Sequence, residues 1–298
     1  MTTATISANT RRMRGAVNRD TRFANTLASE WLKLATLRST YITLGLGYLL
    51  SVATSAIVGI ALGSTRDTWS GDISPITASM VGTVFGLIVY SVFGVLTVSR
   101  EYASGTMRLT LTATPDRRQV FLAKLTLVTA IVTVAGVATT VSMFAISQAV
   151  FSATGMPTAS FTDGDALHMV LGLGLAMPFF PIMGMAFGML LRSTAGGITT
   201  ALGLLWLPQI FGEFVPTWFQ EHILSLLPSN GIDSVTVSHI ESTPAYSAPL
   251  LGAALLPVGV TVLVVALVAP HPRTLRTIGW ATAAASVASA VLLVVAIR

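Results

Sequence analysis

The sequence of 298 residues contains no cysteine, and only 10% of its residues are charged. The absence of cysteine excludes disulfides, zinc–thiolate sites and thiol catalysis. An ordinary soluble domain carries roughly 25% charged residues. Twelve acidic and seventeen basic residues cannot cover a soluble protein of this length, and 53% of the residues are hydrophobic. The missing polar surface must face lipid, so the composition predicts an integral membrane protein.

The sequence also lacks the motifs of an enzyme. Its only lysines, Lys33 and Lys124, do not follow glycine, so the Gly-x4-Gly-Lys-Ser/Thr phosphate loop is missing. The four histidines have no metal-ligand spacing, and neither a nucleophile elbow nor an HExxH motif occurs. We therefore expect no catalytic residue, metal site or cofactor in this chain. The net charge of +5 comes from short basic clusters between apolar runs, which excludes a nucleic-acid groove.

Long apolar runs dominate what is present. A helix needs about 20 apolar residues to cross the hydrocarbon core. The runs that reach this length are 42–62, 76–98, 125–151, 166–191, 197–215, 248–269 and 277–297. They predict an all-α polytopic membrane protein with six core transmembrane helices and a seventh at the C-terminus. The seventh run is rich in small residues, so it either crosses the membrane or lies along it.

The distribution of basic residues predicts the orientation. If the N-terminus is cytoplasmic, 15 of the 17 Lys and Arg residues lie on inner segments, and only Arg66 and Arg298 lie outside. Cytoplasmic loops of membrane proteins carry this excess of positive charge. The sequence therefore predicts a multi-pass protein with a cytoplasmic N-terminus.

An amphipathic helix is predicted just before the first apolar run. Phe23, Leu27, Trp31 and Leu34 recur at helical spacing and share one face. The charged residues around the rest of this helix include Glu30, Lys33 and Arg38. A helix with tryptophan and basic residues beside a membrane span is expected to lie in the cytoplasmic interface.

The expected organisation follows from these segments. It comprises a basic flexible cytoplasmic tail (1–21), the interfacial helix (22–40), a transmembrane domain (41–270) and an extra C-terminal hydrophobic helix (271–298). Within the transmembrane domain, an inner segment (99–124) and an outer segment (216–247) are too long to be simple turns.

Glycine and proline patterns predict how the spans pack. Pairs of glycines four residues apart occur at Gly59 and Gly63, Gly82 and Gly86, and Gly184 and Gly188. Such pairs let helix backbones approach closely. The sequence Pro178-Phe179-Phe180-Pro181 should bend the fourth span, because proline removes a backbone donor.

Four motifs resemble those of ABC-2 type permeases, particularly actinobacterial ones. They are SEWLKLATLRST at 29–40, the Glu-Tyr-x-x-Gly-Thr pattern within 99–124, LRSTAGGI at 191–198 and LPSN at 227–230. Their order and predicted membrane sides fit the family over nearly the whole chain. The family's usual form has six spans, so the C-terminal hydrophobic helix departs from it.

The resemblance implies a permease powered by a separate cytosolic ATPase, which binds ATP and Mg. In this family the inner loop after the second span forms a coupling helix that docks on the ATPase. Carried onto this sequence, the ATPase-coupling candidates are Arg100, Glu101, Tyr102, Ser104, Gly105, Thr106, Arg108 and Arg192. Alternatively, Glu101 and Arg108 pair with each other or with lipid headgroups. A second permease copy or a related permease completes the transporter, which belongs in the plasma membrane of a bacterium.

The function implied is export of an amphiphilic or hydrophobic compound, such as an antibiotic, a peptide or a lipid-like molecule. The expected substrate path includes Phe85, Tyr90, Phe93, Phe179, Phe180, Gln209 and Glu213. Glu213 either lies at the outer interface or meets a polar or cationic substrate at the exit. Two other classes stay open: a membrane sensor or immunity module that recruits an ATPase without bulk transport, and a gradient-driven carrier.

Overall fold

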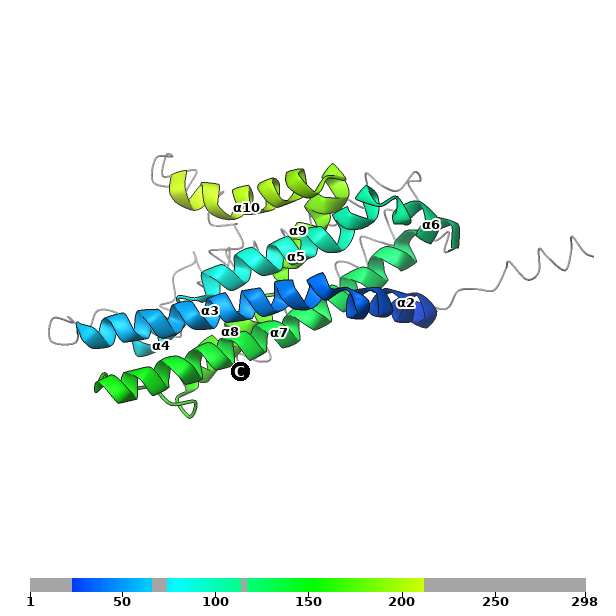
Figure 1. The fold of residues 1–298 in the computed structure, drawn as a ribbon. Helices are drawn as coiled ribbons and strands as arrows, with labels where there is room; N and C mark the ends of the chain where they lie inside the picture. The colour runs from blue at the N-terminus through cyan, green and yellow to red at the C-terminus, as the bar shows by residue number, and fades with distance from the viewer. Residues whose placement is uncertain (1–22, 66–73, 114–116, 212–298) are drawn as a thin grey trace, which may run out of the picture.

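The computed structural model describes residues 23–65, 74–113 and 117–211, and the regular structure in these ranges is entirely helical (Figure 1). The predicted basic tail, the sixth and seventh spans, the outer segment 216–247 and Glu213 lie outside the described residues. The all-α architecture is confirmed over the described part of the chain.

The helices follow one another with short connections. They are α2 (Phe23–Thr36), α3 (Arg38–Ser64), α4 (Pro75–Ser79), α5 (Thr83–Ala103), α6 (Thr106–Ala113), α7 (Arg117–Thr154), α8 (Gly164–Ala176), α9 (Phe179–Leu191) and α10 (Thr194–Phe211). The long helices α3, α5 and α7 lie side by side, and α2 and α6 gather at one end of this bundle (Figure 1). We call this end, formed by α2, α6 and the adjoining turns of α3, α5 and α7, the α2–α6 end.

Four stretches are long and apolar enough to cross a membrane: Arg38–Ser64, Pro75–Ala103, Gln119–Thr154 and Gly164–Leu191. They correspond to the first four predicted spans. The fifth predicted span is α10, of which Thr194–Leu207 is apolar but shorter. A multi-span membrane protein is therefore confirmed, whereas the total number of spans depends on residues outside the described part.

The second predicted span is interrupted rather than continuous. α4 ends at Ser79 and α5 begins at Thr83, with Gly82 just before it. A β-carbon on Gly82 would lie 2.0 Å from the carbonyl oxygen of Ser51, so only glycine allows α3 to approach here. The amide of Gly82 donates to the hydroxyl of Ser55 over 3.1 Å. A side chain of α3 thus satisfies a backbone donor where the span is broken.

The fourth span is divided by its prolines, as the sequence predicts. α8 ends at Ala176 and α9 begins at Phe179. Pro178 and Pro181 carry no amide hydrogen, so the helical hydrogen bonds that these positions would donate are missing. The interruption lies just before α9, which packs against α5 through Pro181.

Glycines hold α5 and α9 close together. A β-carbon on Gly94 would lie 2.0 Å from the carbonyl oxygen of Pro181, and one on Gly184 would lie 2.3 Å from that of Ser91. The predicted pair at Gly59 and Gly63 lies instead against the side chains of Val150 and Thr154 of α7. The backbone-to-backbone contact of α5 with α9 is how membrane helices associate without a hydrophobic driving force.

The segment expected as one helix over 22–40 is divided at Leu37, whose backbone is extended. The buried face of α2 consists of Thr26, Glu30 and Leu34, whereas Trp31 is 52% exposed. The exposed part of the predicted apolar stripe is therefore available to a membrane interface. Glu30 can be buried because it pairs with Lys33 of the same helix and with Lys124 of α7.

The close contact of α5 and α9 predicts a strong effect of Gly94→Ala. The added methyl group would overlap the backbone at Pro181, which cannot move aside as a flexible side chain does. We expect a loss of about 1–3 kcal/mol of stability, the usual cost of overpacking, measured by thermal unfolding in detergent. Gly45→Ala is the control, since nothing lies within 4 Å of its added β-carbon. Equal melting temperatures for the two variants would contradict this packing.

Candidate functional site

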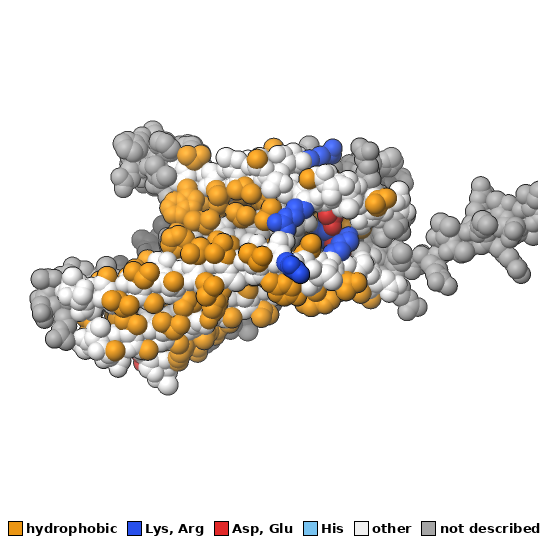
Figure 2. Space-filling model, in the orientation of Figure 1, with side chains coloured by type: hydrophobic (Ala, Val, Ile, Leu, Met, Phe, Trp, Pro, Cys, Tyr) orange, Lys and Arg blue, Asp and Glu red, His pale blue; other side chains and the backbone are white. Residues whose placement is uncertain are grey.

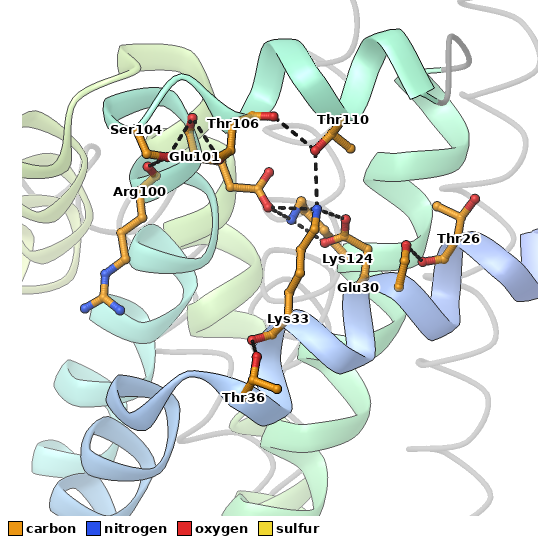
Figure 3. Close-up of polar contacts among 11 residues, drawn as sticks. Thr26, Glu30, Lys33, Thr36, Arg100, Glu101, Ser104, Thr106, Thr110 and Lys124 are labelled. Atoms are coloured by element: carbon orange, nitrogen blue, oxygen red, sulfur yellow. Dashed lines mark hydrogen bonds and ion pairs between the residues drawn. The ribbon is translucent and has the colours of Figure 1, made fainter.

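Four charged side chains meet at the α2–α6 end, and we call them the charged cluster: Glu30, Lys33, Glu101 and Lys124 (Figure 3). Lys33 Nζ lies 2.6 Å from Glu30 Oε1 and 3.3 Å from Glu101 Oε1. Lys124 Nζ lies 2.7 Å from Glu101 Oε1 and also pairs with Glu30 Oε2. Two acids and two bases thus neutralise one another.

The cluster joins three helices that are distant in sequence. Glu30 and Lys33 are one turn apart on α2, Glu101 lies in the last turn of α5, and Lys124 lies near the start of α7. The side chains of Glu30 and Lys124 are 2% and 6% exposed, whereas that of Lys33 is 39% exposed. Buried charges persist only when they are paired, so the packing at this point depends on α2, the end of α5 and the start of α7 together.

Hydrogen bonds extend the cluster to α6. Lys33 Nζ also donates to Thr110 Oγ1 over 3.3 Å, which ties the middle of α6 to α2. A separate hydrogen bond joins α7 to α2: the side-chain amide of Gln119 at the start of α7 donates to Thr26 Oγ1 over 2.9 Å. Within the described ranges, the buried Oε2 of Glu101 accepts no hydrogen bond. Both lysines instead converge on Oε1 of that carboxylate.

Lys33 is positively charged at neutral pH. Partial burial by itself lowers the pKa of Lys33, but its hydrogen bond to the Glu30 carboxylate and the negative charges of Glu101 and Glu30 outweigh that effect. The net effect raises the pKa above the ordinary value for lysine. Lys33 therefore remains an ammonium group in the cluster throughout the physiological range.

A tight turn connects α5 to α6. Ser104 caps α5, and Gly105 has a φ of 72°, which favours glycine. The amide of Gly105 donates to the carbonyl of Tyr102 over 3.3 Å, and the hydroxyls of Ser104 and Thr106 are 2.9 Å apart. α6 begins at Thr106 and presents Leu109 at 69% exposure. This short helix is thus held firmly at its start and open along one side.

Two arginines of the predicted coupling set have partners on neighbouring helices. Arg192 adopts a left-handed conformation at the end of α9, with a φ of 49°. Its guanidinium lies 5.8 Å from the ring centroid of Tyr102, which is within cation–π range. Arg100 donates to the hydroxyl of Ser39 at the start of α3. These contacts link the end of α5 to both α3 and α9.

The predicted coupling residues are thus brought together, apart from Arg108, whose side chain lies outside the described part. Glu101 pairs with Lys33 and Lys124, so Arg108 would have to compete with two lysines for the Glu101 carboxylate. The sequence reasoning missed Lys124, Thr110 and Leu109 as members of this site. The sequence did carry a signal for Lys124, because lysine occurs at only two positions in the chain. The role of the predicted coupling residues in docking an ATPase stays a prediction.

The expected substrate-path residues are dispersed. Tyr90, Phe93 and Phe180 are buried in the core, and Tyr90 Oη lies 2.8 Å from Thr139 Oγ1. Phe85 is 39% exposed and Phe179 is partly buried. The side chain of Gln209, like Glu213, lies outside the described part. A substrate path along these residues stays a prediction.

The fold and the comparisons establish the class. The apolar helices define a multi-pass membrane protein, and the charged cluster joins two segments whose motifs resemble ABC-2 permeases, those at Glu30 and Lys33 in α2 and at Glu101 in α5. Residues 26–206 match the family described as ABC-2 family transporter protein, so the chain belongs to that family. The family is a membrane transport component and is not itself catalytic. Comparison with curated proteins and with solved structures gives no match.

The charged cluster predicts unequal effects when its two lysines are replaced. Lys124→Met leaves Glu30 and Glu101 without their buried partner, and removing one member of a buried pair typically costs about 3–5 kcal/mol. Lys33→Met should cost less, because water reaches its half-exposed side chain. Thermal unfolding of both variants in detergent measures the difference.

The double variant Glu30→Gln, Lys124→Met tests whether the cost comes from stranded charge. It removes one acid together with the base, so it should be more stable than Lys124→Met alone. A double variant less stable than Lys124→Met would contradict the electrostatic explanation.

Proposed function

We propose that this chain is the permease subunit of an ATP-driven exporter in the plasma membrane of a bacterium, with its N-terminus in the cytoplasm. A separate ABC ATPase subunit binds ATP and Mg and supplies the power. A second copy of the chain or a related permease completes the transporter. The cargo is an amphiphilic or hydrophobic compound, such as an antibiotic, a peptide or a lipid-like molecule. Family membership supports the permease role, and the predicted charge asymmetry supports the orientation.

The observation that carries the proposal is the attachment of α6 to the spans. α6 leaves α5 through the Ser104–Gly105 turn, and Thr110 ties it to Lys33 on α2. The last turn of α5 is in turn bound to α7 through Glu101 and Lys124. A force applied to α6 by an ATPase would therefore move the ends of α5 and α7 together, because the paired charges resist separation.

The exposed side of α6 supplies the docking surface in this proposal. Leu109 is 69% exposed at the end that carries the charged cluster, and an exposed apolar side chain there suits a protein contact. Glu101 acts mainly through the cluster, since both its described partners are lysines of this chain. Leu109 is thus a sharper test of docking than Glu101, whose replacement would also disturb the fold.

We expect Leu109→Ser to weaken binding of the ATPase without destabilising the permease. Truncating an apolar anchor in an interface commonly costs about 1–2 kcal/mol, so ATPase co-purification should fall roughly tenfold. Leu32→Ser is the matched control, because Leu32 is 63% exposed at the same end but belongs to α2. Unchanged co-purification with Leu109→Ser, or an equal loss with Leu32→Ser, would overturn docking on α6.

Export itself is tested with inverted membrane vesicles that contain the permease and its ATPase. An amphiphilic fluorescent dye should accumulate inside when ATP is added, because the cytoplasmic face is outermost in these vesicles. A catalytically inactive ATPase should abolish this accumulation. Accumulation that persists with the inactive ATPase would indicate a gradient-driven carrier, and ATPase binding without accumulation for a panel of dyes would indicate a sensor.

A further inference from the structure

A cavity of about 420 Å³ adjoins the charged cluster at the α2–α6 end. It lies between α2, the start of α3 and the end of α5, and the lining residues include Lys33, Leu34, Ser39, Phe93, Leu96 and Arg100. Figure 2 shows Lys and Arg side chains around an acidic side chain on this face, with hydrophobic surface alongside. The cavity thus combines charged and apolar walls.

The acids of the lining are already paired, whereas one of its bases is not. Glu30 and Glu101 are only 2% and 13% exposed, and their described partners are the two lysines. The ammonium of Lys33 is in turn bonded to both acids and to Thr110. Arg100 is exposed, and its described partner is the neutral hydroxyl of Ser39. A molecule that enters therefore meets the positive charge of Arg100 at the rim, whereas the negative charge behind it is already neutralised.

The apolar side of the cavity reaches the surface beside the start of the first span. Leu37, Phe93 and Leu96 line the cavity, and Leu37, just before α3, is 46% exposed. Exposed apolar side chains beside a spanning helix face the lipid. The cationic rim and the apolar wall therefore lie at the boundary between headgroups and tails.

We propose that this cavity binds a phospholipid with an anionic headgroup. The phosphate lies against the Arg100 guanidinium at the rim, and the acyl chains leave along Leu37 and Leu96. Guanidinium groups bind phosphate through paired hydrogen bonds, and basic pockets at the cytoplasmic ends of membrane helices recognise anionic headgroups. The placement in the cytoplasmic leaflet rests on the proposed orientation.

The same geometry disfavours other ligands. A cationic amphiphile would approach Arg100 before it reached the buried carboxylates, which are already paired with lysines. A soluble phosphate ester would satisfy the rim but leave the apolar wall uncovered. An anionic phospholipid complements both parts, and it would also fill the space between α2 and the end of α5.

The test compares lipid binding by the purified full-length permease in nanodiscs of phosphatidylglycerol and phosphatidylcholine. Native mass spectrometry should show preferential retention of phosphatidylglycerol, and Arg100→Gln should reduce this preference about fivefold, the effect of one basic residue on an anionic lipid. Arg38→Gln is the matched control, because Arg38 is exposed one residue before Ser39 but does not line the cavity. Leu96→Trp, which fills the apolar side, should also displace the lipid.

Several results would overturn the site. No preference for phosphatidylglycerol, or an equal loss with Arg38→Gln, would mean that only diffuse surface charge acts. Displacement of the lipid by equimolar glycerol phosphate would indicate a site for soluble anions. If Arg100→Gln abolished ATPase co-purification and left the lipid preference intact, the cavity would be a protein contact. Because lipid binding is measured without the ATPase, failure of the exporter proposal would leave this result unaffected.

Discussion

The buried pairing of Glu30 with Lys124 is the interaction on which the α2–α6 end depends. Glu30 also pairs with Lys33 and Lys124 with Glu101, and these pairings keep the buried ions inside the protein, since an unpaired buried ion is far costlier than an apolar residue. The pair fixes α2 against α7, and Glu101 brings the end of α5 to the same point. The segment before the first span is thereby part of the membrane domain rather than a separate attachment.

A second constraint acts within the bundle, where backbone approaches backbone. Gly94 against Pro181 and Gly184 against Ser91 place α5 and α9 in direct contact. α9 begins just after the interruption at Met177 and Pro178. Glycines pack the spans tightly, and the charged cluster fixes their ends, so motion at the α2–α6 end is expected to displace whole helices rather than single side chains.

These two constraints relate the site to the proposed function. α6 is the exposed element, and its attachments through the Gly105 turn and Thr110 lead to α5 and α2. The cavity beside Arg100 lies against the same helix ends, so a lipid bound there would contact elements that an ATPase would move. The proposed docking surface, the charged cluster and the proposed lipid site are thus three parts of one end of the molecule.

The sequence by itself determined the membrane class, the first four spans and the bend at Pro178, because hydrophobic length and missing backbone donors are local properties. Its motifs also predicted the family. The tertiary structure alone decided that Lys124 joins Glu30, that Gly82 interrupts the second span against α3, and that the buried face of α2 includes a charged residue. These features depend on contacts between residues distant in the chain, which periodicity within one helix cannot specify.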